Sequence, residues 1–164
     1  MKRNELEHIL KEYHRDAYLW ARQCCGFDED LAKDVLQICY LKILEGKARL
    51  QEIEKSKSWL FSVIRFTAID ELRKNNKNQP LLEEFDRQET YEELDSTDYQ
   101  EIISQLPIRQ REVILMVFYH QMTLEQCANI LEVSIGTART HYDRGKKKLR
   151  ELILKNQTLE QNGK

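Results

Sequence analysis

The chain has 164 residues, of which 41% are hydrophobic and 33% are charged, and its formal net charge at pH 7 is −2. This length allows one ordinary domain or two small ones, and the five Gly and two Pro favour helices over short strands. No apolar run reaches membrane-spanning length and no signal peptide is recognisable, so we expect a cytoplasmic protein without membrane insertion.

The N-terminal part of the chain predicts helices separated by glycines. Apolar residues at alternating steps of four and three predict one continuous helix from about residue 6 to residue 24, which Gly26 ends. Asp28 is placed to cap a second helix over 30–44, which stops before Gly46. This second helix has apolar residues on two faces, so it is either central in a bundle or in contact with a partner.

A third helix is expected from residue 59 to residue 74. The polar stretch 47–57 before it predicts a loop or a short helix, and Ser56 or Ser58 can serve as its N-cap. The polar segment 75–80, which ends in a proline, should break the helix.

The middle of the chain is acidic. Between residues 75 and 98 only Lys77 and Arg87 oppose eight acidic side chains, a composition typical of a flexible linker. We therefore expect a helical domain over 1–75 and an acidic linker over 76–98.

A second helical domain is expected over 99–155, followed by a polar, frayed tail over 156–164. It begins with a short helix that ends at Pro107, and a helix over about 108–119 follows.

Two capped helices then follow at the spacing of a helix-turn-helix. Thr123 and Gln126 form a capping-box pattern at the start of the first helix, which ends near Leu131, and Ser134 can cap the second. In a helix-turn-helix the second helix lies in the major groove of DNA. The pattern therefore predicts a domain that binds duplex DNA.

The last helix should have a buried face and an outward face. Residues at steps of three and four are expected to point inward: Ile135, Ala138, Tyr142, Gly145, Leu149 and Leu152. Polar residues between them are expected to face DNA: Thr137, Arg139, Thr140, His141, Arg144 and Lys147. Arg can bind guanine with two hydrogen bonds, and Thr can contact base edges. A basic run suits phosphates, although an isolated run of this kind could equally be a solvated helix face: Lys146, Lys147, Lys148 and Arg150.

Sequence patterns of catalysis are missing from the chain. It has no Walker loop, no HExxH motif and no nucleophile elbow, so we expect neither enzymatic activity nor a cofactor. Cys24, Cys25, Cys39 and Cys127 form no CxxC pair. We expect buried thiols in a reducing compartment rather than a metal site.

Segments in both halves of the chain carry a family resemblance. In the first half they read D-V-L-Q-I-C-Y at 34–40, W-L-F-S-V-I-R at 59–65 and D-E-L-R-K at 70–74. In the second half they read L-P at 106–107, R-E-V at 111–113 and S-I-G-T-A-R-T at 134–140. In this order, with an acidic linker between the halves, they resemble bacterial RNA polymerase sigma factors of the extracytoplasmic function (ECF) type.

The resemblance implies an all-α fold of two small domains joined by a flexible acidic linker. It also implies partners: core RNA polymerase through its β′ clamp coiled coil and its β subunit, promoter DNA, and an anti-sigma factor. In this family the first domain binds polymerase and the minus-10 promoter element, and the second reads the minus-35 element as duplex.

Site residues follow from the same resemblance, position by position. The polymerase-binding residues it implies are Asp34, Leu36, Gln37 and Tyr40. The minus-10 residues it implies are Lys55, Lys57, Ser58, Trp59, Arg65, Arg73 and Lys74. The minus-35 residues, which follow from the outward face of the last helix and the capped starts of both helices, are Thr123, Ser134, Thr137, Arg139, Thr140, His141, Arg144 and Lys147. For Trp59, packing in the core is the alternative to contact with a DNA strand.

Four positions depart from the family pattern. Phe66 stands where the family has Asn, Ile38 where it has Glu, and Ala138 where it has Val. Glu132 stands where the helix-turn-helix turn has Gly, which costs on the order of 1 kcal/mol if that residue keeps a positive φ.

A stand-alone helix-turn-helix regulator is the alternative function. Such regulators commonly dimerise to read a palindrome. No dimerisation helix or ligand domain is recognisable here, so we favour a transcription initiation factor that recognises both promoter elements.

Overall fold

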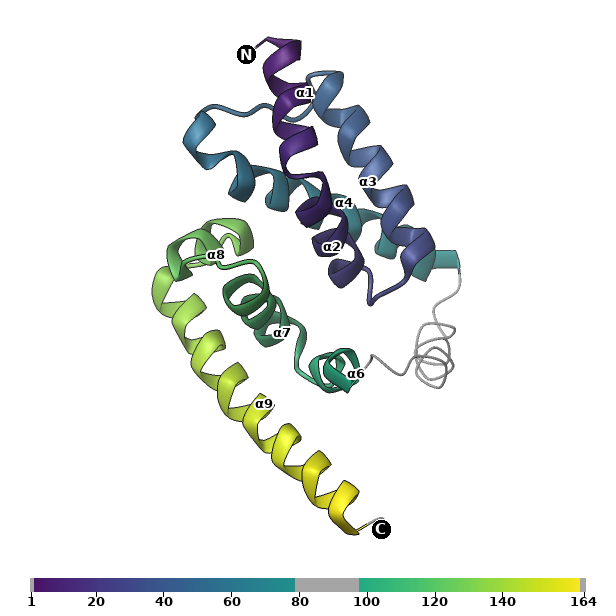
Figure 1. Cartoon of the computed structure of the whole chain (residues 1–164). Helices are drawn as coiled ribbons and strands as arrows, with labels where there is room; N and C mark the ends of the chain where they lie inside the picture. Colours follow the sequence, from purple (N-terminus) through teal and green to yellow (C-terminus); the bar gives the residue numbers. More distant parts are fainter. Residues whose placement is uncertain (1, 79–97, 163–164) are drawn as a thin grey trace. The chain divides into compact units, whose positions relative to one another are not determined.

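The structure is a computed structural model that describes residues 2–78 and 98–162. The chain divides into two compact units, Met1–Glu89 and Thr90–Lys164, named here the N-terminal unit and the C-terminal unit. All regular elements in the described ranges are helical, which confirms the all-α prediction (Figure 1). The predicted linker lies almost wholly outside these ranges. No helix within them is both long enough and apolar enough to cross a membrane.

Within residues 2–78 the N-terminal unit is a bundle of four α-helices with one short 3₁₀ turn. These elements are α1 (Arg3–Glu12), α2 (His14–Cys24), α3 (Glu29–Leu44), η1 (Ile53–Lys55) and α4 (Ser56–Asn78). Helix α2 packs against both α3 and α4, which also pack against each other, and α1 lies against α3 and α2. Of the two alternatives expected for residues 47–57, a loop or a short helix, the structure has a loop that ends in the short 3₁₀ turn η1.

The expected single helix over residues 6–24 is wrong, because the structure has two helices there. Tyr13 separates them with φ −100° and ψ 9°, outside the helical values. The chain has no Gly or Pro at this point. Because the helix is divided, the buried face of α1 can pack against α3 while that of α2 packs against α3 and α4. The spacing of apolar residues in the sequence does not reveal this effect of tertiary packing.

A buried aromatic pair joins α2 to α4. The rings of Trp20 and Phe61 stack with centroids 5.2 Å apart, and both side chains are fully buried. Trp20 Nε1 also donates a hydrogen bond of 3.0 Å to the Phe61 carbonyl oxygen. The indole thus contributes apolar area while its single polar group is satisfied, so it fixes α4 against α2.

The ends of α3 follow the sequence signals. Gly26 leaves α2 with φ +64°, and Gly46 follows α3 with φ +79°, a conformation that favours glycine. Asp28 Oδ1 accepts a hydrogen bond of 3.1 Å from Leu31 N, which confirms the predicted N-cap.

Helix α4 is longer at both ends than expected. It begins at Ser56 itself, whose hydroxyl donates back to the Ile53 carbonyl, so neither Ser56 nor Ser58 lies outside the helix as a cap. It continues to Asn78 instead of ending at residue 74. Asn lowers helix propensity without forbidding helix, and the residue that proline restricts is the one just before Pro80.

The C-terminal unit contains the two helices of the helix-turn-helix and a supporting layer. Its elements are α6 (Asp98–Ser104), α7 (Ile108–Ile114), a π-helical turn η3 (Leu115–Tyr119), α8 (Leu124–Leu131) and α9 (Ile135–Asn162). Helices α6, α7 and α8 all pack against α9, which runs along the unit (Figure 1). The expected helix over 108–119 therefore exists, with its last turn widened to the π form.

Gly145 sets the closest approach between α9 and α7. A Cβ atom at this position would lie 2.9 Å from Ile114 Cγ1 and 3.3 Å from Gln110 Cβ. Contacts this short are rare for real side chains, so only glycine lets the two helices come together here.

Two expectations for α9 are wrong. Ile135 was expected to be buried, yet its side chain is 45% exposed, because it stands in the first turn before α9 reaches the rest of the unit. The frayed tail from residue 156 is instead helical as far as Asn162. Ala138 and Gly145 are buried as predicted, and the three remaining inward positions are half-buried: Tyr142, Leu149 and Leu152.

Candidate nucleic-acid and partner interfaces

The two helices of the helix-turn-helix are capped as the sequence predicts. Thr123 Oγ1 accepts a hydrogen bond of 3.1 Å from Gln126 N, and Gln126 Oε1 accepts one of 2.9 Å from Thr123 N. Ser134 Oγ accepts one of 3.1 Å from Thr137 N at the start of α9. These caps orient the first turns of both helices and leave Thr123 and Ser134 exposed beside them.

The outward side of α9 gathers the residues predicted to read the minus-35 element. Thr137, Arg139, Thr140, Arg144 and Lys147 are exposed and His141 is half-buried. Thr140 Oγ1 donates to the Gly136 carbonyl oxygen at 3.0 Å, which leaves its lone pairs available to a donor. The three cations of this group form no ion pair with another described residue. They are free to bind an anionic partner.

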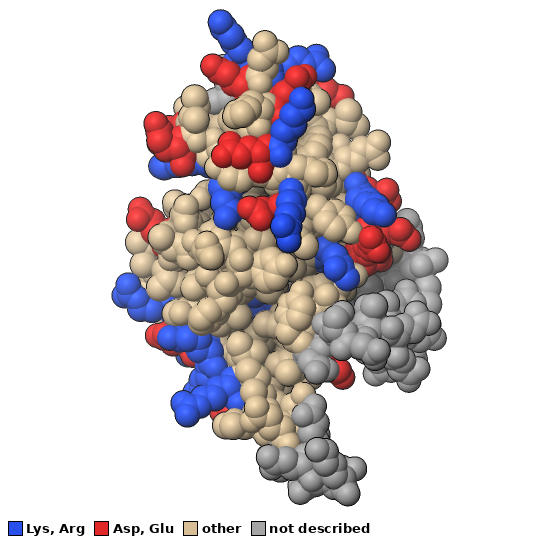
Figure 2. All heavy atoms as spheres, in the orientation of Figure 1, with Lys and Arg blue, Asp and Glu red and all other residues tan. Residues whose placement is uncertain are grey.

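The basic run of α9 divides between two sides of the helix. Lys146 Nζ lies 4.2 Å from the centroid of the Tyr142 ring and 3.8 Å from Asp143 Oδ1. With Arg150 it lines an apolar groove beside exposed Phe118 and Leu154. Lys and Arg side chains gather along α9 in the space-filling view (Figure 2).

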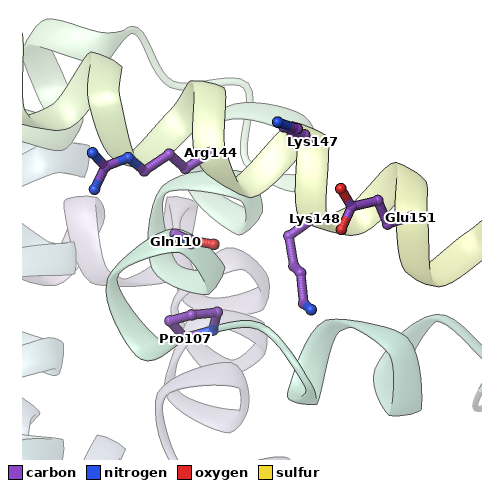
Figure 3. A pocket seen from close by; sticks show the side chains of 6 residues that line it. All are labelled: Pro107, Gln110, Arg144, Lys147, Lys148 and Glu151. Carbon is purple, nitrogen blue, oxygen red and sulfur yellow. The ribbon is translucent and has the colours of Figure 1, made fainter.

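The other side of α9 holds a second hollow, here called the α7–α9 pocket. Its lining residues are Pro107, Gln110, Arg144, Lys147, Lys148 and Glu151 (Figure 3). Sequence reasoning did not single out Gln110, because its role depends on the contact between α7 and α9 and no local pattern marks it.

In the N-terminal unit, α3 carries an exposed row of Asp34, Gln37 and Leu41, here called the α3 row. These residues are spaced by three and four, so they share one helix face. Leu41 is 51% exposed and was missed by the sequence analysis, although its spacing from Gln37 was a usable signal. Large apolar side chains beside polar ones on a surface are typical of contact sites for other proteins.

Leu36 does not belong to the α3 row. Its side chain is only 6% exposed and packs in the core of the N-terminal unit, so the prediction that it contacts polymerase is corrected. Tyr40 is half-buried and its hydroxyl lies 2.9 Å from His14 Nδ1. Burial raises the pKa of Tyr40 to about 12, so this side chain stays a neutral phenol.

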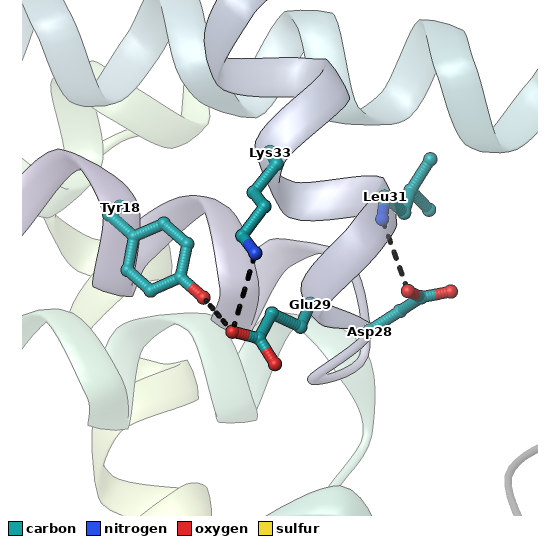
Figure 4. A network of polar contacts seen from close by, with 5 residues as sticks. All are labelled: Tyr18, Asp28, Glu29, Leu31 and Lys33. Carbon is teal, nitrogen blue, oxygen red and sulfur yellow. Dashed lines mark hydrogen bonds and ion pairs between the residues drawn. The ribbon is translucent and has the colours of Figure 1, made fainter.

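The start of α3 is fixed by a polar network next to the α3 row. Tyr18 Oη donates a hydrogen bond of 3.1 Å to Glu29 Oε1, and Lys33 Nζ lies 3.7 Å from the same oxygen (Figure 4). Partial burial, together with this carboxylate, raises the pKa of Tyr18 above its usual value. The network holds the first turns of α3 against α2.

The predicted minus-10 residues fall into separate groups. Lys55, Lys57, Ser58 and Trp59 cluster at the start of α4, where Lys57 Nζ lies 3.9 Å from Asp16 Oδ2. Arg73 and Lys74 are exposed near the other end of the helix. At 1.5 Å per residue, Trp59 and Arg73 are about 21 Å apart along the helix axis, so they cannot form one pocket.

Arg65 and Trp59 differ from their expected exposure. Arg65 is only 6% exposed and has a partner within the chain, so the prediction that it offers a charge to DNA is corrected. Trp59 is half-buried, which leaves part of its ring accessible. Phe66, where the family has Asn, is exposed on α4.

Three of the four thiols are buried, those of Cys25, Cys39 and Cys127, and Cys24 is half-buried. No group of three or more His, Cys, Asp or Glu in the part of the chain that the structure describes could hold a metal ion. Burial raises the pKa of Cys25 and Cys39 to about 12, which keeps both thiols protonated.

Two family descriptions match the chain. Residues 9–78 match "Sigma-70 region 2" and residues 96–149 match "Sigma-70, region 4". The chain is 27% identical to RNA polymerase sigma factor SigV of Bacillus subtilis over 148 residues, covering 88% of this chain and 86% of SigV. It is 29% identical to ECF RNA polymerase sigma factor SigX of the same organism over 157 residues, covering 87% of this chain and 80% of SigX.

A solved structure shares the fold. It is the sigma factor RpoE of Bartonella quintana in complex with the anti-sigma factor NepR, with a TM-score of 0.73 and 21% identity. The match covers 90% of this chain and 96% of RpoE.

The alternative function, a stand-alone helix-turn-helix regulator, would explain the match of the C-terminal unit but not that of the N-terminal unit. The C-terminal unit alone would fit either function, but residues 9–78 match a second conserved sigma region in the expected order. The chain therefore belongs to the RNA polymerase sigma factors of the ECF type, transcription initiation factors that direct core RNA polymerase to promoters.

Proposed function

We propose that the two units divide the work of promoter recognition. The N-terminal unit binds core polymerase and the minus-10 element, and the C-terminal unit reads the minus-35 element as duplex. The observation that carries this proposal is the presence, on separate units, of a mixed apolar and polar row on α3 and an unpaired cationic face on α9. Catalysis of RNA synthesis stays with the polymerase, and the chain acts in the cytoplasm beside it.

The α3 row is the proposed polymerase contact, with the β′ clamp coiled coil as its partner. Leu41 supplies apolar area that binding would remove from water, and Asp34 and Gln37 supply polar groups that fix register. Tyr40, half-buried and held by its hydrogen bond to His14, is proposed to take part in the same contact. The β subunit is the proposed partner of the C-terminal unit.

The start of α4 is the proposed contact for the minus-10 strand. Lys55 and Lys57 suit its phosphates, while the accessible edge of Trp59 and the Ser58 hydroxyl suit an unstacked base. Arg73 and Lys74, a few turns further along α4, suit phosphates of the neighbouring DNA.

The first turns of α9 are the proposed reader of the minus-35 element. Arg139 and Thr140 contact base edges, and Thr137 and His141 flank them. Arg144 and Lys147 contact phosphates, as do the exposed capping residues Thr123 and Ser134.

An anti-sigma factor is the proposed regulator. The solved structure that shares this fold is a sigma factor bound to such a protein. We expect a partner that covers the α3 row or α9 to compete with polymerase or promoter.

Run-off transcription with core polymerase tests the function directly. The template is the DNA upstream of the chain's own coding sequence, and the readout is a transcript that requires the added protein. The matched control is the double variant Asp34→Ala/Gln37→Ala, which should give no transcript although its helical content is unchanged. Equal transcription with and without the chain would contradict the proposal.

A further inference from the structure

The α7–α9 pocket has the size and chemistry of an anion site. It is an open surface hollow of about 270 Å³ between the start of α7 and the middle of α9. One water occupies roughly 30 Å³ in the liquid, so the pocket has room for a phosphate group with several waters. The side chains of α9 line one side of it, and Pro107 and Gln110 line the other (Figure 3).

Close helix packing creates the pocket. Because Gly145 has no side chain, α9 approaches the backbone of α7 near Gln110 and Ile114. Gln110 thereby lines one hollow with Arg144, which precedes Gly145, and with Lys148, which comes three residues after it. The arrangement is thus built by the packing of two helices and does not depend on a single surface side chain.

The charge of the lining favours an anion. Arg144, Lys147 and Lys148 face one carboxylate, that of Glu151. Within residues 2–78 and 98–162 none of these three cations forms an ion pair or a hydrogen bond. The three cations outnumber this one carboxylate, so the hollow has a net positive charge that attracts an anion.

Gln110 adds a polar group that has no partner. Its Oε1 atom is buried, and no hydrogen bond to it exists among the described residues. A buried acceptor without a partner is destabilising. The Nε2 atom of the same amide is a donor, and Gln side chains commonly donate to phosphate oxygens. The Oε1 atom can accept a hydrogen bond from the Lys148 ammonium group.

We propose that the α7–α9 pocket holds one backbone phosphate of the promoter DNA, clamped by Lys148 and Gln110 together with Arg144. The proposal rests on the proposed function, in which α9 reads the minus-35 element. DNA is favoured as the source of the anion because the pocket continues the outward face formed by Thr137, Thr140 and Arg144. A helix that leaves the major groove passes the phosphates beside it.

The test measures promoter binding by holoenzyme, assembled from the full chain and core polymerase, over a series of salt concentrations. Lys148→Ala should weaken binding to all sequences alike by about three- to tenfold and lower the salt slope by about one unit. Gln110→Ala should weaken binding by a few fold without changing the slope, because the amide is uncharged. Gln110→Glu should weaken it further, since it adds a negative charge at the same place.

Lys146→Ala is the matched control. It removes the same charge two residues before Lys148, but from the side of α9 that faces Tyr142. It should change binding less than Lys148→Ala does. An equal loss in both variants would mean that net charge alone matters, and the pocket proposal would be overturned.

Neutral methylphosphonates placed singly along the promoter locate the phosphate. At one position of the DNA backbone, the methylphosphonate should weaken promoter binding by the wild type. The same substitution should cause no further loss in Lys148→Ala, which already lacks the contact. If every substitution weakens both proteins equally, or if Gln110→Ala and Lys148→Ala bind like the wild type, the proposal is wrong. If the pocket variants bind promoter like the wild type but no longer bind a protein partner, the pocket holds a carboxylate of that partner instead of a DNA phosphate.

Arg139→Ala separates this proposal from the function on which it rests. If Arg139→Ala changes base preference while the pocket variants behave as wild type, only the pocket assignment fails. If the holoenzyme binds no promoter at all, the proposed function itself fails.

Discussion

Glu132 occupies a left-handed position in the turn between α8 and α9, with φ +58° and ψ 46°. The hydrogen bonds of this turn are intact, since Glu132 N donates to Asn129 O at 3.3 Å and Val133 N donates to Ala128 O at 3.0 Å. The cost therefore lies in the contact between its Cβ and the following carbonyl oxygen. The departure from the family's Gly keeps the turn geometry and lowers its stability.

Glu132→Gly should raise the free energy of unfolding of the C-terminal unit by about 1 kcal/mol, because glycine removes the Cβ contact. Thermal melts of the full chain measure this. Glu132→Ala is the control, since it removes the carboxylate but keeps Cβ and should gain little. Equal melting temperatures for the two variants would show that backbone strain is not the cause.

Arg139 and Lys147 should have different effects on promoter choice. Arg139→Ala should lower the binding free energy that distinguishes the cognate base from the other bases by about 1–3 kcal/mol. It should therefore relax base preference at one or two minus-35 positions. Lys147→Ala should weaken every sequence alike and lower the salt slope by about one unit. Binding of a panel of single-base promoter variants by holoenzyme distinguishes them. If Arg139→Ala weakens all sequences equally, its side chain contacts phosphate.

At the scale of elements, the helix starts set by local chemistry were predictable. Asp28, Thr123 and Ser134 each cap a helix within three residues of their own position, so the sequence contains both partners of each hydrogen bond. The outward face of α9 was predictable for the same reason, because helical spacing fixes it.

Features that depend on contacts between helices were not predictable. The break at Tyr13 has no local signal, and the burial of Leu36 and Arg65 follows from the packing of α3 and α4 in the bundle. The exposure of Ile135 reflects where α9 begins relative to α8. The family motif placed Leu36 and Arg65 on helices correctly, but helix membership does not decide which side chains face outward.

Two glycines of α9 provide a matched test of the packing between α7 and α9. Gly145→Ala should destabilise the chain by about 1–3 kcal/mol, because its Cβ would meet Ile114 at 2.9 Å. Gly136→Ala should instead stabilise it by about 0.5–1 kcal/mol, since its nearest neighbour, Ser134 Oγ, is 3.9 Å away and alanine favours helix. Urea unfolding of both variants measures the difference. Shifts of the same sign would contradict the close approach of the two helices.

The α3 row makes a prediction for the helix as a whole. Asp34→Ala and Gln37→Ala should each weaken binding of core polymerase, by about 2–5 kcal/mol if the group is desolvated in the interface. Leu41→Ala should also weaken binding, through lost apolar area. Lys11→Ala, an exposed change on α1 outside the α3 row, should bind as the wild type does. If all three variants of the α3 row bind core polymerase with wild-type affinity, the α3 row is not the polymerase contact. Circular dichroism checks that each variant is folded.

At the scale of the whole molecule, the small net charge is the sum of strongly acidic and strongly basic segments, and the two units have surfaces of different chemistry. The net charge of −2 averages an acidic middle with a basic α9. The α3 row mixes apolar and polar groups, as contact sites for proteins do, whereas α9 offers unpaired cations, which suit nucleic acid. Each of the two surfaces thus belongs to a unit with its own buried core.

Independence of the two units can be measured with a double-mutant cycle. Leu41→Ala and Arg139→Ala lie in different units, each with its own core, so we expect their effects on forming the ternary complex of chain, core polymerase and promoter to add within about 0.3–0.5 kcal/mol. Arg144→Ala and Lys148→Ala line one pocket and should show a clear coupling energy. Titrating polymerase and promoter against single and double variants gives both values. A coupling between the units as large as that within the pocket would mean that polymerase binding changes how the C-terminal unit reads DNA.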